Sequence, residues 1–183
     1  MRVITGTAKG VNLKAPDGML TRPTADRAKV GLFNIIQFDI YGAVLDLFGG
    51  TGQLGIECLS RGAAQAVFVD GRKEAAELIK ENLRRTRLAD KGRVVCMDYM
   101  DYLNSCNQTF HLIFLDPPYA EKYLECALKR ISEIDILAEN GIIVTERPVG
   151  KALDGEYPGL TRSKDYKYGK TLITLFRRER DIP

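Results

Sequence analysis

The segment LIFLDPPYA, residues 112–120, combines residue types that can bind and orient an amino group. Pro117 favours an extended conformation for Asp116, because the residue before a proline avoids the helical region. The two prolines also remove two backbone donors, so the loop presents a carboxylate, a carbonyl oxygen and the ring of Tyr119. Two acceptors can turn the lone pair of an exocyclic amine toward an electrophilic methyl group, while the ring stacks on a flipped-out base. We therefore predict a catalytic loop of Asp116, Pro117, Pro118 and Tyr119, with a purely structural proline loop as the alternative.

A glycine-rich turn is the second candidate, in the segment VLDLFGGTGQLGIECLSRGA at residues 44–63. Glycines at the end of an apolar run let the backbone turn tightly and approach a ligand closely. The turn reads GGTGQLG, which is not the GxGxxG dinucleotide pattern, and no Lys-Ser or Lys-Thr follows it to form a phosphate loop. The segment therefore predicts a ligand-binding turn of another kind, with a purely structural turn as the alternative.

Five short apolar runs each contain or end in a carboxylate: Asp46, Asp70, Asp98, Asp116 and Glu146. Because ligands of open α/β sheets bind at the carboxyl ends of the strands, these groups predict a ligand-binding edge. Asp70 follows the glycine turn by about 20 residues, where an acid can accept both ribose hydroxyls. Asp98 is placed to accept from an adenine amine, and Asp46 to face a cationic amino-acid group. Each acid alone fits a helix cap better, but together they predict an adenosine site that suits S-adenosyl-L-methionine rather than a pyrophosphate.

The elements that position these groups alternate along the chain. Short apolar runs are expected to form strands at residues 43–48, 66–70, 93–98, 112–116 and 141–146. The amphipathic stretches between them are expected to form helices near residues 53–61, 72–87, 99–105 and 120–133. Such alternation predicts an α/β fold with a doubly wound, mostly parallel sheet.

Both ends of the chain depart from this alternation. Residues 157–177 lack a helical period and turn around Tyr168, which predicts a C-terminal antiparallel hairpin. Residues 1–20 are expected to form a small basic β-hairpin, and residues 21–183 the main domain. Early in this domain, Thr24 is expected to cap an amphipathic helix.

The chain has 183 residues, of which 45% are hydrophobic and 28% charged, enough for one domain with a substantial core. Its net charge of +3 is unevenly distributed, because residues 1–30 sum to +4, residues 31–146 to −5 and residues 147–183 to +4. The basic ends indicate contact with a polyanion, with scattered solubilising charge as the alternative. No apolar stretch reaches the ~20 residues of a membrane span, and the N-terminus lacks the apolar core of a signal peptide. We therefore expect a soluble, cytoplasmic protein.

Histidine and cysteine are poorly placed for catalysis or metal binding. His111 is the only histidine, and the four cysteines show no CxxC spacing. Both observations argue against a metal site and against Ser-His or Cys-His catalysis. Cys58, Cys96 and Cys126 lie among apolar neighbours and are expected to be buried thiols. We therefore expect the chemistry to use carboxylates, backbone groups or a cofactor.

The DPPY motif behind a glycine-rich first strand resembles the S-adenosylmethionine-dependent amino-methyltransferases of nucleic-acid bases. More closely, the chain is similar to the bacterial 16S rRNA (guanine-N(2))-methyltransferase family. The resemblance covers nearly the whole length, in MRVITGTAKGVNL, TRPTADRAKVGLFNII, VLDLFGGTGQLGIECLSRGA, FVDGRKEA, LDPPYA and YGKTLITLFRR. TRPTADR followed by LFN is the most discriminating part, because general base methylases lack it. Two departures are Val30-Gly31, where the family usually has Glu-Ala, and FGGTG, where it often has FAGSG.

This resemblance implies a Rossmann-like class I methyltransferase fold and S-adenosyl-L-methionine as the cofactor. The implied cofactor-binding residues are Thr24, Asp46, Phe48, Gly49, Gly50, Gly52, Asp70 and Asp98. The implied residues that hold the guanine amine are those of the DPPY loop, Asp116, Pro117, Pro118 and Tyr119. RNA contacts are expected from Arg2, Lys9, Arg22 and Arg27. The implied partner is 16S rRNA or the assembling small ribosomal subunit, with no membrane and no metal.

Two other functions are weighed against this one. A DNA adenine or cytosine amino-methyltransferase shares the DPPY motif, but it usually needs a sizeable target-recognition insertion, for which 183 residues leave little room. A cofactor-binding regulator without catalysis would not need an intact DPPY loop. The sequence therefore predicts methyl transfer from S-adenosylmethionine to the exocyclic N(2) amine of a guanine in 16S rRNA.

Overall fold

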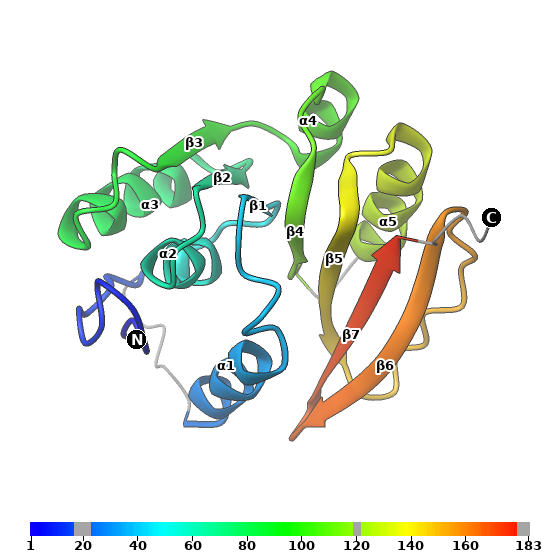
Figure 1. Cartoon of the computed structure of the whole chain (residues 1–183), viewed down its shortest axis with the longest axis horizontal. Coiled ribbons are helices and arrows are strands. Elements are labelled where there is room, and N and C mark those ends of the chain that lie inside the picture. The colour runs from blue at the N-terminus through cyan, green and yellow to red at the C-terminus, as the bar shows by residue number, and fades with distance from the viewer. Residues whose placement is uncertain (17–22, 119–121, 179–183) are drawn as a thin grey trace.

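A seven-stranded sheet forms the centre of the protein in the computed structural model, which describes residues 1–16, 23–118 and 122–178. Its strands are β1 (Ala43–Asp46), β2 (Gln65–Asp70), β3 (Gly92–Cys96), β4 (Phe110–Leu115), β5 (Leu137–Pro148), β6 (Leu160–Tyr168) and β7 (Thr171–Arg178). Their order across the sheet is β3-β2-β1-β4-β5-β7-β6 (Figure 1). Strands β1 to β5 are parallel, whereas β7 runs antiparallel to both β5 and β6. The predicted doubly wound, mostly parallel sheet with a C-terminal antiparallel hairpin is confirmed.

In the described parts of the chain, five helices cover the sheet: α1 (Pro23–Ile35), α2 (Gln53–Ser60), α3 (Lys73–Arg85), α4 (Tyr99–Ser105) and α5 (Tyr123–Ile134). Helix α1 begins at Pro23, so Thr24 lies in its first turn and the prediction that Thr24 caps the helix is wrong. Proline is favoured at the first helical position, because the N–H that it lacks would have no partner within the helix there.

Alternate residues of the central strands face two separate cores. Val44, Phe68 and Phe114 pack in the core under α1, α2 and α3, whereas Leu45 and Ile113 pack in the core under α4 and α5. This division follows from the period of two in a strand, because successive side chains point to opposite faces. A side chain at the end of a strand therefore faces the helices that its alternate neighbours face.

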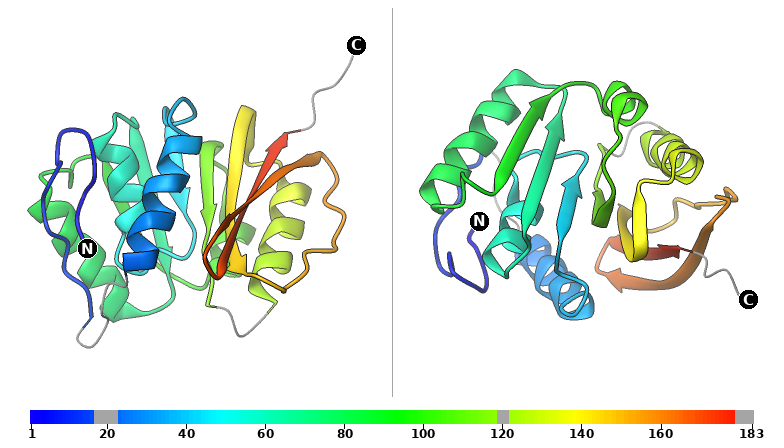
Figure 2. Two further views of the ribbon diagram at one scale, coloured as in Figure 1. Left: turned by 90° about the horizontal axis from the view of Figure 1, so that it is seen from below. Right: turned by 45° about the horizontal axis from the view of Figure 1, so that its top comes forward.

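The N-terminal segment folds back on itself beside α2 and α3. Arg2 and Asn12 form an antiparallel bridge, and the Val3 N–H donates to the Val11 carbonyl over 3.0 Å. The predicted hairpin is therefore present as a single bridge with flanking hydrogen bonds. The segment and the β6–β7 hairpin lie at opposite ends of the sheet (Figure 2).

Two of the three cysteines expected to be buried are exposed. Cys58 is buried, but Cys96 ends the edge strand β3 and Cys126 lies on the outer side of α5. Apolar neighbours in sequence did not predict burial at these two positions, because an edge strand and a surface helix each leave one side to solvent.

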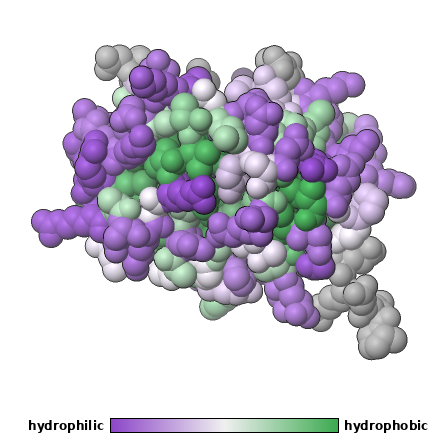
Figure 3. Space-filling model, turned by 90° about the horizontal axis from the view of Figure 1, so that it is seen from above, coloured by the Kyte–Doolittle hydropathy of each residue, from purple (hydrophilic) through white to green (hydrophobic). Residues whose placement is uncertain are grey.

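The surface seen from above is mostly hydrophilic, with apolar areas that polar groups separate (Figure 3). Phe38, in the loop after α1, is 88% exposed and is the clearest exception among the large apolar side chains that the structure describes. Within the described parts of the chain, no helix combines the length and the apolar composition that crossing a membrane requires.

Candidate active site

A cavity of about 380 Å³ opens at the carboxyl ends of the parallel strands. Its size lies within the range of about 300–1,000 Å³ that small-molecule sites occupy. Many residues predicted from the sequence line it, namely Asp46, Phe48, Gly49, Gly50, Asp70, Asp98, Asp116 and Pro118. The fold thus brings the glycine turn, the strand-end acids and part of the DPPY loop to one cavity.

The glycine turn between β1 and α2 has the backbone conformation that its sequence suggests. Gly50 and Gly52 have φ angles of 54° and 77°, in the left-handed region that side chains with a Cβ rarely adopt. The Gly50 N–H donates to an Asp70 carboxylate oxygen over 3.0 Å, which ties the turn to the end of β2. Gly52 precedes α2 and does not line the cavity, so its contribution is to shape the turn.

Asp70 is a carboxylate with strong local partners. The Arg72 side chain donates to both of its oxygens over 3.0 Å, and the Arg72 and Gly50 backbone N–H groups donate as well. Burial acts to raise the pKa of Asp70, but these hydrogen bonds outweigh it and hold the pKa below its ordinary value. The Arg72 side chain is 70% exposed, so a ligand hydroxyl could replace it on the carboxylate at little structural cost.

Asp46 and Asp116 have the opposite environment. Burial raises the pKa of Asp46 to about 7, with a smaller contribution from the charge of Asp70, although the Gly55 N–H donates to Asp46 over 3.2 Å. Burial also raises the pKa of Asp116 well above its ordinary value, and the charges of Glu146 and Asp46 act in the same direction. Near neutral pH these carboxyl groups therefore favour a ligand that brings positive charge or hydrogen-bond donors.

Asp98 caps a helix, and it also faces the cavity. One of its oxygens accepts from the Met100 N–H over 2.8 Å and from the Asp101 N–H over 3.4 Å at the start of α4. The cap explains why an acid follows β3, as expected for each acid taken alone. A second role as an acceptor for an adenine amine stays a prediction.

Three aromatic rings lie on the cavity wall, and the sequence predicted only one of them, Phe48. The centroid of the Phe48 ring lies 5.1 Å from that of Tyr99 and 6.2 Å from that of Tyr123, neither of which was predicted. Tyr99 and Tyr123 pack edge to face with centroids 5.4 Å apart, and both line the cavity. The only signal for Tyr99 was its position directly after Asp98, and such a group of rings offers a flat apolar surface to a base.

Comparisons with known proteins agree with this arrangement. Residues 1–177 match the family model described as "Conserved hypothetical protein 95". Over 180 residues the chain is 31% identical to "Ribosomal RNA small subunit methyltransferase D" of Escherichia coli (strain K12), which covers 98% of this chain and 90% of that protein. The chain belongs to this methyltransferase family. The family resemblance found in the motifs is thereby confirmed.

Two further relatives of the methyltransferase family cover nearly the whole chain. YlbH of Bacillus subtilis (strain 168), described as a candidate rRNA methyltransferase, is 39% identical over 183 residues, which are 97% of this chain and 99% of that protein. The solved structure of yhhF from Escherichia coli, described as a candidate methyltransferase, superposes with a TM-score of 0.87 at 31% identity and covers 98% of each chain. The class I methyltransferase fold is therefore confirmed as well.

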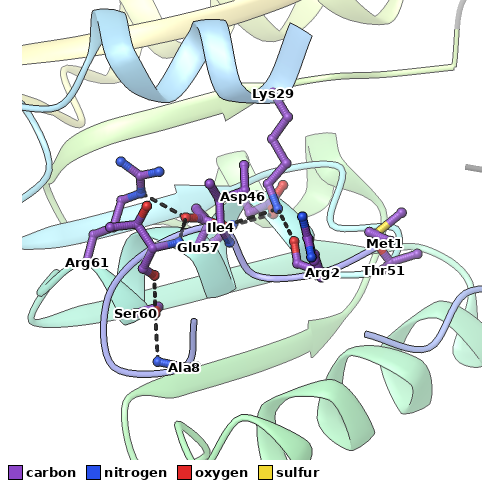
Figure 4. A network of polar contacts seen from close by, with 12 residues as sticks. Met1, Arg2, Ile4, Ala8, Lys29, Asp46, Thr51, Glu57, Ser60 and Arg61 are labelled. Carbon is purple, nitrogen blue, oxygen red and sulfur yellow. Dashed lines mark hydrogen bonds and ion pairs between the residues drawn. The ribbon is translucent and has the colours of Figure 1, made fainter. Parts of the chain in front are cut away.

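The methyltransferase also uses its N-terminal segment to complete the cavity, which sequence reasoning missed. Met1 lines the cavity, and the Thr51 hydroxyl donates to its sulfur over 3.4 Å. Buried Glu57 of α2 anchors the segment by accepting from the Ile4 and Thr5 N–H groups (Figure 4). No local pattern in the sequence pairs residues so far apart.

The remaining predicted residues fall into two groups. Pro117 lines a smaller neighbouring cavity together with Glu146, and Arg2 and Lys9 are exposed on the N-terminal segment. Tyr119, Arg22 and the side chains of Thr24 and Arg27 lie outside the described residues, so their predicted roles stay predictions. In the parts of the chain that the structure describes, no three His, Cys, Asp or Glu side chains are grouped so that they could hold a metal ion.

Proposed function

We propose that this protein transfers a methyl group from S-adenosyl-L-methionine to the exocyclic N(2) amine of a guanine in small-subunit (16S) rRNA. The observation that supports this most directly is that Asp116 of the DPPY loop shares one cavity with the glycine turn and Asp70. A group that can bind an amine and groups that can bind an adenosine therefore line the same cavity. The names of two relatives refer to rRNA methyltransferases, which supports the substrate class.

The chain's own residues fit the cofactor. Asp70 offers both carboxylate oxygens to ribose hydroxyls once Arg72 moves aside, and the left-handed glycine turn leaves room beside it. Asp46, with its raised pKa, becomes fully charged when a cationic group lies near it. S-adenosylmethionine, when bound, supplies an electrophilic methyl group on a sulfonium.

We assign Asp116 to bind the exocyclic amine of the target guanine. Its carboxyl group and the Pro117 carbonyl oxygen accept the two amine hydrogens, which directs the nitrogen lone pair toward the methyl group. The amine loses one proton as the new N–C bond forms, or after it. Because burial and neighbouring carboxylates raise the pKa of Asp116, this group is a better acceptor for that proton than an ordinary aspartate.

We assign the basic ends of the chain to bind the phosphate backbone of the rRNA. Residues 1–30 and 147–183 each sum to +4, and the N-terminal segment (residues 1–16) and the β6–β7 hairpin within these ranges lie at opposite ends of the sheet. Such an arrangement attracts the phosphates at both ends and leaves the carboxylates for the base and the cofactor.

The experiment that tests this function compares methyl incorporation into small-subunit particles, free 16S rRNA and DNA, using labelled S-adenosylmethionine. We expect incorporation into one of the two RNA substrates, and N2-methylguanosine as the labelled nucleoside after complete digestion. Labelled N6-methyladenine or N4-methylcytosine in DNA, with unlabelled RNA, would contradict the proposal.

A further inference from the structure

Glu146 lies beside Asp116 on the neighbouring strand. Leu115 of β4 is in register with Thr145 of β5, so the next residues on the two parallel strands are Asp116 and Glu146. Both side chains point to the α1–α2 face. Asp116 and Glu146 lie two residues after Phe114 and Val144, which pack in that core, and residues two apart on a strand share one face. They also line the same small cavity, and the charge of Glu146 is, after burial, the strongest influence that raises the pKa of Asp116.

The position of Glu146 is fixed by a network on the opposite face of the strand. Its neighbour Arg147 is buried and donates to the Thr174 hydroxyl over 2.6 Å, to the Asp165 carboxylate over 3.1 Å and to the Lys151 carbonyl over 3.1 Å. These bonds tie the end of β5 to β6, to β7 and to the following loop. Glu146 is therefore presented by a rigid strand end, as a group that must discriminate between ligands requires.

Two adjacent carboxylates match the hydrogen-bonding edge of only one amino-bearing base. Guanine presents the N1–H beside the N2 amine, so its Watson–Crick edge offers two adjacent donor groups to a pair of acceptors. Adenine and cytosine each place a ring nitrogen acceptor beside their amine, and that lone pair would face a carboxylate. A second carboxylate beside the amine-binding group thus favours guanine and penalises the other two bases.

We infer that Glu146 is a specificity-determining residue that accepts the N1–H of the target guanine while Asp116 accepts from its N2 amine. The inference rests on the proposed function, and it names the group that recognises the base.

The test uses RNA in which the target guanine is replaced by 2-aminopurine, which keeps the 2-amine but has an acceptor at N1. The position of the target is first located with the wild-type protein by mass spectrometry of nuclease fragments. We expect the wild-type protein to prefer guanine over 2-aminopurine by about 100-fold, because the analogue leaves the carboxylate facing a lone pair. Glu146→Gln should lower guanine methylation by about 10-fold or more and reduce the preference to below about 10-fold, since the amide can donate to N1.

Matched measurements separate recognition from structure. Glu139→Gln, an exposed acid on the same strand, should keep the wild-type preference, and Glu146→Gln should keep the wild-type affinity for S-adenosylmethionine in calorimetry. Glu146→Ala provides a second variant and should also lose the preference. Equal losses on both RNAs, or an unchanged preference, would overturn the inference while leaving the proposed function intact. Failure of the wild-type protein to form N2-methylguanosine in any RNA would overturn the proposed function and this inference together.

Discussion

Glu57 and Asp46 are both buried carboxylates on the face of the sheet that α1 and α2 cover, but their surroundings differ. Glu57 lies 3.2 Å from the Lys29 ammonium and 2.9 Å from the Arg61 guanidinium, and it accepts two backbone N–H groups of the N-terminal segment (Figure 4). Asp46 accepts one backbone N–H, and the charged group that most affects its pKa is another carboxylate, Asp70. Among the residues that the structure describes, cations balance the charge of Glu57, whereas the main charged neighbour of Asp46 is an acid.

The difference indicates which buried acids hold the structure together and which are available to a ligand. A buried charge is costly unless cations or donors compensate it, so an acid that lacks compensation in the chain marks a place where a ligand supplies it. Asp116 belongs with Asp46, because burial, Glu146 and Asp46 all raise its pKa. Glu57 anchors the N-terminal segment, and the strand-end acids form the candidate active site.

The largest effect on stability is expected for Glu57→Gln. The substitution leaves Lys29 and Arg61 without their shared counter-charge, so the free energy of unfolding should fall by about 3 kcal/mol or more. Chemical denaturation near neutral pH measures this. Glu133→Gln, which breaks an exposed ion pair with Arg130 on α5, is the control and should cost less than about 1 kcal/mol. Similar losses in both variants would remove the distinction drawn for Glu57.

Asp116→Ala should have the largest effect on the reaction. We expect turnover on small-subunit RNA to fall by about 100-fold or more, the scale observed when a preorganised electrostatic group is lost. The affinity for S-adenosylmethionine should stay nearly unchanged, because Asp116 is assigned to the amine. Single-turnover methylation and calorimetry measure the two quantities. Near-normal methylation by the variant would exclude Asp116 from the mechanism.

Asp70→Ala should weaken the binding of S-adenosylmethionine by about 1–3 kcal/mol, through the loss of a charge-assisted acceptor. Arg72→Ala sharpens this test, because it removes the partner of Asp70 and keeps the carboxylate. If Asp70 binds the ribose, Arg72→Ala should leave the affinity in calorimetry unchanged or raise it. Wild-type affinity in Asp70→Ala would place the ribose elsewhere.

The smallest effects are expected on the basic N-terminal segment. Arg2 adjoins Met1, which lines the cavity, whereas Lys9 follows Ala8, whose N–H donates to the Ser60 hydroxyl at the far end of α2. Arg2→Glu should therefore weaken RNA binding by about tenfold and reduce its salt dependence by about one unit of slope, with a smaller effect for Lys9→Glu. Titrations at several salt concentrations measure the slopes. Wild-type slopes in both variants would place the RNA elsewhere, with the basic C-terminal hairpin as the next region to test.

The sequence was sufficient for the sheet and for most of one cavity, because both depend on local patterns. Apolar runs with an acid at the end marked the strands, and parallel pairing then brought Asp46, Asp70 and Asp116 to one edge. The contribution of Met1 and the pairing of Arg72 with Asp70 were not predicted. Met1 reaches the cavity through contacts between segments about 50 residues apart in sequence, which no local period encodes.

The pKa values were beyond sequence reasoning for a similar reason. Asp46 and Asp70 follow similar apolar runs, yet the pKa of one is raised and that of the other lowered. The difference comes from burial under α2 in one case and from the Arg72 side chain in the other. Both depend on how the side chains pack in three dimensions.

The most direct test of the account is the pH dependence of the affinity for S-adenosylmethionine, because the carboxylate of Asp46 is predicted to face the cationic amino-acid group of this ligand. Burial raises the pKa of Asp46 to about 7, so the ligand-free folded protein retains a proton on Asp46 that the unfolded chain has already lost. The stability that this proton contributes is lost as the pH rises toward about 7. The carboxylate present above about pH 7 should attract this cationic group. Calorimetry between about pH 6 and pH 8 should show the affinity for S-adenosylmethionine rising by up to about tenfold in the wild-type protein and staying constant in Asp46→Asn. A constant affinity in the wild-type protein, or the same rise in Asp46→Asn, would contradict the claim that the uncompensated acids bind a cationic cofactor.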